Sequence, residues 1–72
     1  MTDTKELNRL ICESGLTKTY IARNLGITLY GFQKKRENRS QFTAEEIGIL
    51  CKLLKIKSLR ERDRIFFAND VD

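Results

Sequence analysis

Apolar residues recur three or four positions apart in five short segments of the chain, which is the spacing that lines one face of an α-helix. Immediately before these segments stand Asp3, Thr17, Thr28, Thr43 and Ser58. Short side chains with an oxygen atom are favoured there because they accept hydrogen bonds from the free N–H groups of the first helical turn. The pattern therefore predicts five short helices, each beginning directly after one of these residues.

The expected ends of the first three helices are residues that tolerate a left-handed backbone, namely Gly15, Gly26 and Asn38. The chain has no proline and only four glycines, which also favours helices. We predict an all-α fold, a compact bundle of five short helices that forms one domain over residues 1–72. Residues 69–72, at the C-terminus, are expected to fray.

The fourth helix has the best specified start. Thr43 and Glu46 have the spacing of a capping box, and Phe42 and Ile47 have the spacing of a hydrophobic staple. The helical period gives the inward positions of all five segments. These are Leu7, Leu10, Ile11 and Ser14, then Ile21, Ala22 and Leu25, then Phe32, then Ile47, Leu50, Cys51 and Leu54, and finally Leu59, Ile65 and Phe66.

The composition argues against catalysis. The chain has no histidine, which is the commonest general base and metal ligand, and its 72 residues leave little room for a walled cleft. Cys12 and Cys51 lack C-x-x-C spacing and lie among apolar residues, so we expect reduced, buried thiols, with a disulfide between them left open. We expect no enzymatic activity, cofactor, metal or small-molecule ligand. Neither a membrane span nor a signal peptide is evident, which predicts a cytoplasmic protein.

The positive charge is concentrated in one segment. The net charge of the chain is +4, and residues 17–39 contain six basic residues against a single acidic one, Glu37. Such one-sided charge on a short segment is typical of a protein that binds a polyanion.

The same segment contains an unusually short connection. Only "GIT", residues 26–28, separates the second and third predicted helices, so these helices must cross steeply, as in a helix-turn-helix unit. Gly26 suits the turn, and the small Ala22 allows close packing. Gly31 has two open explanations: close approach of the backbone to the second helix, or close approach to a sugar-phosphate backbone.

In these features "TKTYIARNLGITLYGFQKKR" resembles the helix-turn-helix of the Cro and phage-repressor family. The segment "NRSQFTAEEIGILCKLLKI" resembles the loop and fourth helix of that family, and "RERDRIFFANDVD" resembles short Cro-like regulators of Firmicutes phages and integrative elements. The resemblance implies a lambda-repressor-like DNA-binding domain, with the helix-turn-helix at about residues 17–37 and a recognition helix at about residues 28–37 in the major groove. It further implies a bacterial, nucleoid-associated transcriptional regulator, a repressor of a prophage or mobile element, that binds a pseudo-palindromic double-stranded operator as a homodimer.

The expected base contacts lie on the third helix. If Phe32 points into the core, Tyr30, Gln33 and Lys34 face the opposite side, with Leu29 on the flank. The base-reading positions of the family fall on the same four residues, although Leu29 is apolar where the family often has a polar residue.

Phosphate contacts are expected from two helix N-termini and from side chains beside the third helix. They are Thr17, Lys18, Thr28, Lys35, Arg36, Arg39, Ser40 and Gln41. For Arg36 an alternative is that its stem covers the core, with only its head near a phosphate.

Two questions stay open at this level. Ile49, Leu53, Phe66 and Phe67 are candidates for a dimer contact, but they equally fit a role in the core. The alternative function is that of a protein-binding module, such as an antitoxin or anti-repressor, which keeps this fold and binds its partner with the fifth helix.

Overall fold

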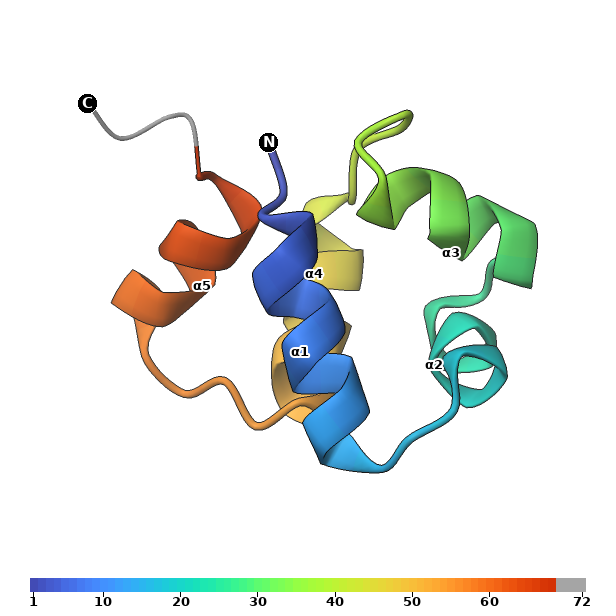
Figure 1. Cartoon of the computed structure of the whole chain (residues 1–72), viewed down its shortest axis with the longest axis horizontal. Coiled ribbons are helices and arrows are strands. Elements are labelled where there is room, and N and C mark those ends of the chain that lie inside the picture. Colours follow the sequence, from blue (N-terminus) through green and yellow to red (C-terminus); the bar gives the residue numbers. More distant parts are fainter. Residues whose placement is uncertain (69–72) are drawn as a thin grey trace.

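A computed structural model describes residues 1–68, and the end expected to fray, residues 69–72, lies outside this range. The described chain is all-helical and contains no strand (Figure 1). Its helices are α1 (Thr4–Ser14), α2 (Lys18–Leu25), α3 (Leu29–Arg36), α4 (Ala44–Leu53) and α5 (Leu59–Phe66). The prediction of five short helices in a compact all-α arrangement is confirmed.

Every helix begins at the residue that the sequence indicated. Asp3, Thr17, Thr28, Thr43 and Ser58 each have an extended backbone and a side-chain oxygen that accepts a hydrogen bond from an N–H in the first turn. The capping box of α4 is complete as well. Local hydrogen bonding therefore sets where each helix starts.

The predicted left-handed residues adopt that conformation. The φ angles of Gly15, Gly26 and Asn38 are 75°, 74° and 65°. Lys55, which follows α4, has a φ of 59° and was not anticipated. Its N–H donates to the Lys52 carbonyl oxygen at 3.3 Å, so it closes the end of α4 without a glycine.

The helices are arranged so that α2 and α3 lie on one side of α1 and α5 lies on the other (Figure 1). α2 packs against both α3 and α4, and α1 packs against α5. Three residues, 26–28, join α2 to α3. No helix within residues 1–68 has the length and apolar character needed to cross a membrane.

Phe32 lies in the centre of the core and is fully buried, together with Leu7, Ile21, Leu50 and Ile65. Its ring meets Phe42 edge-on, with 6.1 Å between centroids. Phe42 in turn meets Phe66 edge-on at 5.7 Å. This row of three rings ties α3 to the loop before α4 and to the end of α5.

Some predicted core positions are wrong. Cys12 and Ser14 are exposed, because Ile11 takes the inward position and Cys12 is turned about 100° away from it. The Ser14 hydroxyl donates to the Ile11 carbonyl at 2.6 Å, so it closes the helix end and does not enter the core. Leu59 is 68% exposed, since the first turn of α5 lies at the edge of the bundle (Figure 1). Both cysteines are free, and Cys51 is half-buried.

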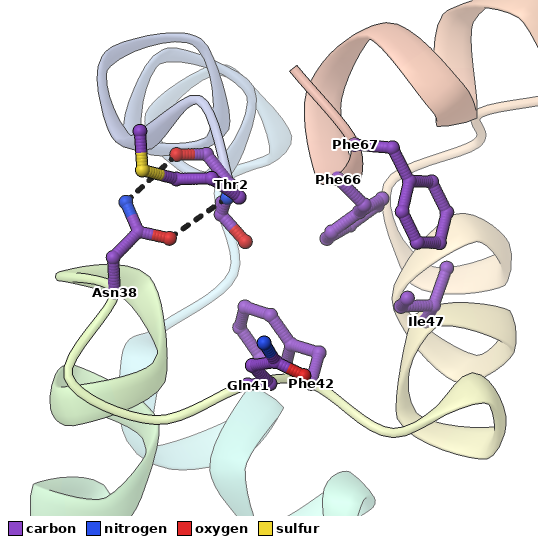
Figure 2. A pocket seen from close by; sticks show the side chains of 8 residues that line it. Thr2, Asn38, Gln41, Phe42, Ile47, Phe66 and Phe67 are labelled. Carbon is purple, nitrogen blue, oxygen red and sulfur yellow. Dashed lines mark hydrogen bonds between the residues drawn. The ribbon is translucent and has the colours of Figure 1, made fainter. Parts of the chain in front are cut away.

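A hydrogen-bonded clamp joins the N-terminal residues to the end of α3 (Figure 2). The N–H of the buried Thr2 donates to Asn38 Oδ1 at 2.8 Å, and Asn38 Nδ2 donates to the Thr2 carbonyl at 2.9 Å. The Asp3 N–H donates to the Ile65 carbonyl at 2.6 Å. The N-terminal residues thus link the end of α3 to α5.

We predict opposite effects of alanine at two glycines. Gly26→Ala should lower the free energy of unfolding by about 1–2 kcal/mol, because its left-handed backbone strains a residue with a Cβ. Gly48→Ala, inside α4 with open space around its Cβ position, should raise it by about 1 kcal/mol. Urea unfolding followed by circular dichroism measures both changes. A stabilising Gly26→Ala would contradict the structure of the α2–α3 connection.

Candidate nucleic-acid interface

The outward face of α3 is set by the burial of Phe32. Leu29 and Tyr30 are 48% and 61% exposed. Gln33 is exposed as well, and Lys34 is half-buried. The four residues predicted to read bases therefore lie on the part of α3 that is directed away from the core.

The surroundings of Gly31 bear on one of the two explanations that the sequence left open for it. The N–H of Gly31 donates to Thr28 Oγ1 at 2.9 Å, which caps α3. A Cβ at Gly31 would lie 3.2 Å from that oxygen and 3.9 Å from the Ile27 Cβ. No atom of α2 lies within 4 Å of that position, so close approach to α2 does not explain the glycine, and close approach to a sugar-phosphate backbone stays a prediction.

The polar side chains on the outward face of α3 contact one another. Lys34 Nζ lies 5.4 Å from the centre of the Tyr30 ring, and Arg39 Cζ lies 5.8 Å from it. Gln33 Nε2 donates to Glu37 Oε2 at 3.2 Å, and Arg39 Nε lies 3.4 Å from Glu37 Oε1. The side chains on this surface therefore hold one another in position.

Lys35 does not belong to this surface. Its ammonium group lies 2.6 Å and 2.7 Å from the two carboxylate oxygens of Glu46, and both side chains are largely buried. Burial by itself would raise the pKa of Glu46, but hydrogen bonds from Lys35 and from the Thr43 N–H lower it below its ordinary value. The expectation that Lys35 contacts phosphate is therefore corrected: its side chain holds α3 against α4.

Arg36 is also directed inward, and only the stem follows the alternative considered for it. It is 8% exposed, its guanidinium lies 5.0 Å from the centre of the Phe32 ring, and Nη1 donates to Asn8 Oδ1 at 2.8 Å. Burial lowers the pKa of Arg36. Because the head is buried with the stem, Arg36 covers the core and is removed from the expected phosphate contacts.

The other expected phosphate contacts remain accessible. Thr17 and Lys18 at the start of α2 are exposed, as is Thr28 before α3. After α3, Arg39 and Gln41 are exposed, and Ser40 is half-buried. The accessible candidates are therefore two helix N-termini and the segment 39–41.

The candidates for a dimer contact do not form one patch. Phe66 is 4% exposed and belongs to the core, so the core role applies to it, whereas Phe67 is more open. Phe66 and Phe67 line a small cavity of about 150 Å³ beside Phe42 (Figure 2). Leu53 lines a separate hollow with Leu10 and Leu16. Ile49 and Leu53 are partly buried and pack against the core.

Sequence reasoning missed the residues that hold this surface in place. Asn38 was identified only as the end of a helix, yet its amide binds Thr2. Glu46 was identified only as part of a capping box, yet it also binds Lys35. The excess of basic over acidic residues gave no sign of which cations had internal partners.

Within residues 1–68 no group of three histidine, cysteine, aspartate or glutamate side chains is placed to hold a metal ion. Comparison of the chain with protein-family models, with curated proteins and with solved structures finds no match.

We predict that Glu46→Gln lowers the free energy of unfolding by about 1–2 kcal/mol at pH 7. The substitution removes the negative charge that pairs with Lys35, whereas the amide oxygen of glutamine can still accept the hydrogen bond from the Thr43 N–H. The folded pKa of Glu46 is lowered, so its contribution is present above the ordinary carboxylate pKa and is lost as the pH falls through the folded value. The difference from the unsubstituted protein should therefore shrink below about pH 4.

Urea unfolding at pH 7 and pH 3 measures this effect. Glu45→Gln is the matched control, because it removes an exposed charge from the same helical turn and should cost about 0.5 kcal/mol. An effect of Glu46→Gln that is equally large at both pH values would contradict the role given to the ion pair.

Proposed function

We propose that this chain is a sequence-specific double-stranded-DNA-binding transcriptional regulator, a Cro-like repressor of a prophage or mobile element. In this proposal α2 and α3 form a helix-turn-helix, and α3 enters the major groove as the recognition helix. One observation carries the proposal. Phe32 anchors α3 so that Leu29, Tyr30, Gln33 and Lys34 face outward, within the segment that holds the positive charge of the chain.

The proposed base contacts follow from the chemistry of the exposed side chains. Lys34 suits O6 and N7 of guanine, and the Gln33 amide suits N6 and N7 of adenine. Leu29, nearly half exposed, suits the methyl group of thymine. Tyr30 lies next to Leu29 on the same exposed surface.

The proposed phosphate contacts position the protein without reading sequence. The N-termini of α2 and α3 supply free N–H groups at Thr17, Lys18 and Thr28. Arg39, Ser40 and Gln41 supply side chains beyond the C-terminal end of α3. Lys35 and Arg36 are left out of this set because their side chains have partners inside the fold.

An α3 of eight residues reads only a few base pairs, so the proposal includes pairing of two copies on a pseudo-palindromic operator. Half-sites about one helical turn apart, roughly 34–36 Å, would suit two such copies. We place this regulator in the bacterial cytoplasm, on the nucleoid, with no cofactor and no enzymatic step.

The alternative function, protein binding through α5, has less surface available than the sequence indicated. Phe66 is buried, which leaves Leu59 in α5 and Phe67 directly after it as the exposed large apolar side chains. The polar side chains beside them carry both signs of charge and pair with one another, as Arg62 does with Asp63 and Arg64 with Glu61. Because the excess of positive charge lies instead in residues 17–39, we favour DNA as the partner.

The proposal predicts that selection of the purified protein on random duplex DNA, at near-physiological salt, enriches an inverted repeat. On the enriched site, Lys34→Ala should relax the base preference at one position and cost about 1–3 kcal/mol. Arg39→Ala should weaken binding to all duplexes similarly and lower the slope of log K against log salt by about one.

Lys57→Ala is the matched control, because it removes an exposed positive charge from the segment between α4 and α5. That segment runs apart from α3 (Figure 1). It should leave both base preference and salt slope nearly unchanged. Retention of duplexes without an enriched motif would contradict sequence-specific regulation. Equal effects of Lys34→Ala and Lys57→Ala would contradict the placement of α3 in the groove.

A further inference from the structure

Tyr30 is an exposed aromatic residue with a cation on each of two neighbouring segments. Lys34 follows it by one helical turn on α3, and its Nζ lies 5.4 Å from the ring centre. Arg39 comes from the segment after α3, and its Cζ lies 5.8 Å from the same centre. Both distances fall within the range of about 6 Å over which a cation is attracted to an aromatic ring.

The backbone brings Arg39 to this position. Asn38 adopts the left-handed conformation and turns the chain back over the end of α3. The Arg39 N–H then donates to the Lys34 carbonyl at 2.9 Å. The Asn38 amide is held in turn by Thr2, so the turn that delivers Arg39 is fixed from the N-terminal side as well.

The ring of Tyr30 has no role in the core. It is 61% exposed, whereas Phe32 on the same helix is fully buried and supplies the packing. Lysine and arginine side chains each carry about 2 kcal/mol of rotamer entropy, which is lost when they are fixed on a partner. Because the ring already attracts both cations in the free protein, less of this entropy remains to be lost when a ligand binds.

Arg39 has a second partner, Glu37, whose Oε1 lies 3.4 Å from Arg39 Nε. Both of these side chains are about half exposed, so solvent and salt weaken this pair. An incoming phosphate can take the place of the Glu37 carboxylate on the guanidinium, while the contact of the guanidinium with the Tyr30 ring is kept.

We propose that Tyr30 is a positioning residue, which acts on DNA through Lys34 and Arg39 and not through its hydroxyl group. The inference rests on the proposed function, in which Lys34 reads a base and Arg39 binds a phosphate. The Tyr30 ring then keeps these two cations at a fixed separation. In this role the aromatic ring of Tyr30 is required and its hydroxyl group is not.

The first test needs no DNA. In the free protein, protons on the Lys34 and Arg39 side chains should show ring-current shifts in the NMR spectrum, because both lie beside the Tyr30 ring. Tyr30→Phe should keep these shifts, and Tyr30→Leu, of similar apolar size, should abolish them without changing the circular dichroism spectrum. Side-chain shifts that are the same in Tyr30→Leu as in the unsubstituted protein would overturn the proposal.

The second test measures binding to a 20-base-pair duplex of random sequence at several salt concentrations. Tyr30→Phe should bind with the same salt slope as the unsubstituted protein. Tyr30→Leu should lower the slope by about one and weaken binding several-fold, because Arg39 no longer neutralises its phosphate on every complex. In Tyr30→Leu, a further Arg39→Ala should then cost less than it does alone.

Equal losses in Tyr30→Phe and Tyr30→Leu would show that the hydroxyl contacts DNA directly and would overturn the positioning role alone. Additive effects of Tyr30→Leu and Arg39→Ala would overturn it too. An unsubstituted protein that does not bind duplex DNA would instead overturn the proposed function, and with it this role of Tyr30.

Discussion

The burial of Phe32 determines how α3 is turned, and most of the candidate interface follows from that rotation. The ring is fully buried and continues edge-on into Phe42, which continues into Phe66. A helix of eight residues has one narrow inward stripe, so anchoring one large side chain fixes the direction of all the others. Truncation of a buried phenylalanine costs about 3–5 kcal/mol, which is a large share of the stability of a domain of this size.

The same rotation sorts the four basic residues of α3 and of the turn after it into two groups. Lys35 and Arg36 fall on the side of Phe32, where Glu46 and Asn8 bind them. Lys34 and Arg39 fall on the side of Tyr30 and stay within reach of solvent. Fewer cations are therefore available to a polyanion than the charge of residues 17–39 indicates. Lys18 and Arg23 on α2 are exposed, and Lys34 and Arg39 share one aromatic ring.

The local features of the fold could be predicted because they depend on residues close in sequence. A threonine and the N–H three residues later, as in the cap of α3 by Thr28, interact wherever the rest of the chain lies. The left-handed ends at Gly26 and Asn38 follow from backbone sterics in the same way. The outward position of Tyr30 and Gln33 followed from the helical period once Phe32 was assigned to the core.

Features that join distant segments could not be predicted from these patterns. Thr2 and Asn38 are 36 residues apart, and no periodicity connects them. The partners of Lys35 and Arg36 lie on α4 and α1, and only the packing of the helices reveals them. The helical period also predicted that Leu59 lies in the core, whereas it is exposed. The period indicates which face of a helix is apolar, but not which turns of that helix extend past the edge of the bundle.

The central claim is that the outward face of α3 is the surface that meets DNA. It is tested most directly by titrating the isotope-labelled protein with duplex DNA at near-physiological salt and following the backbone amide signals by NMR. The account predicts that the largest changes fall on residues 28–41 and at the start of α2, around Thr17 and Lys18, while α5 is unaffected. Changes confined to α5 around Leu59 and Phe67, or spread evenly over the surface, would contradict it.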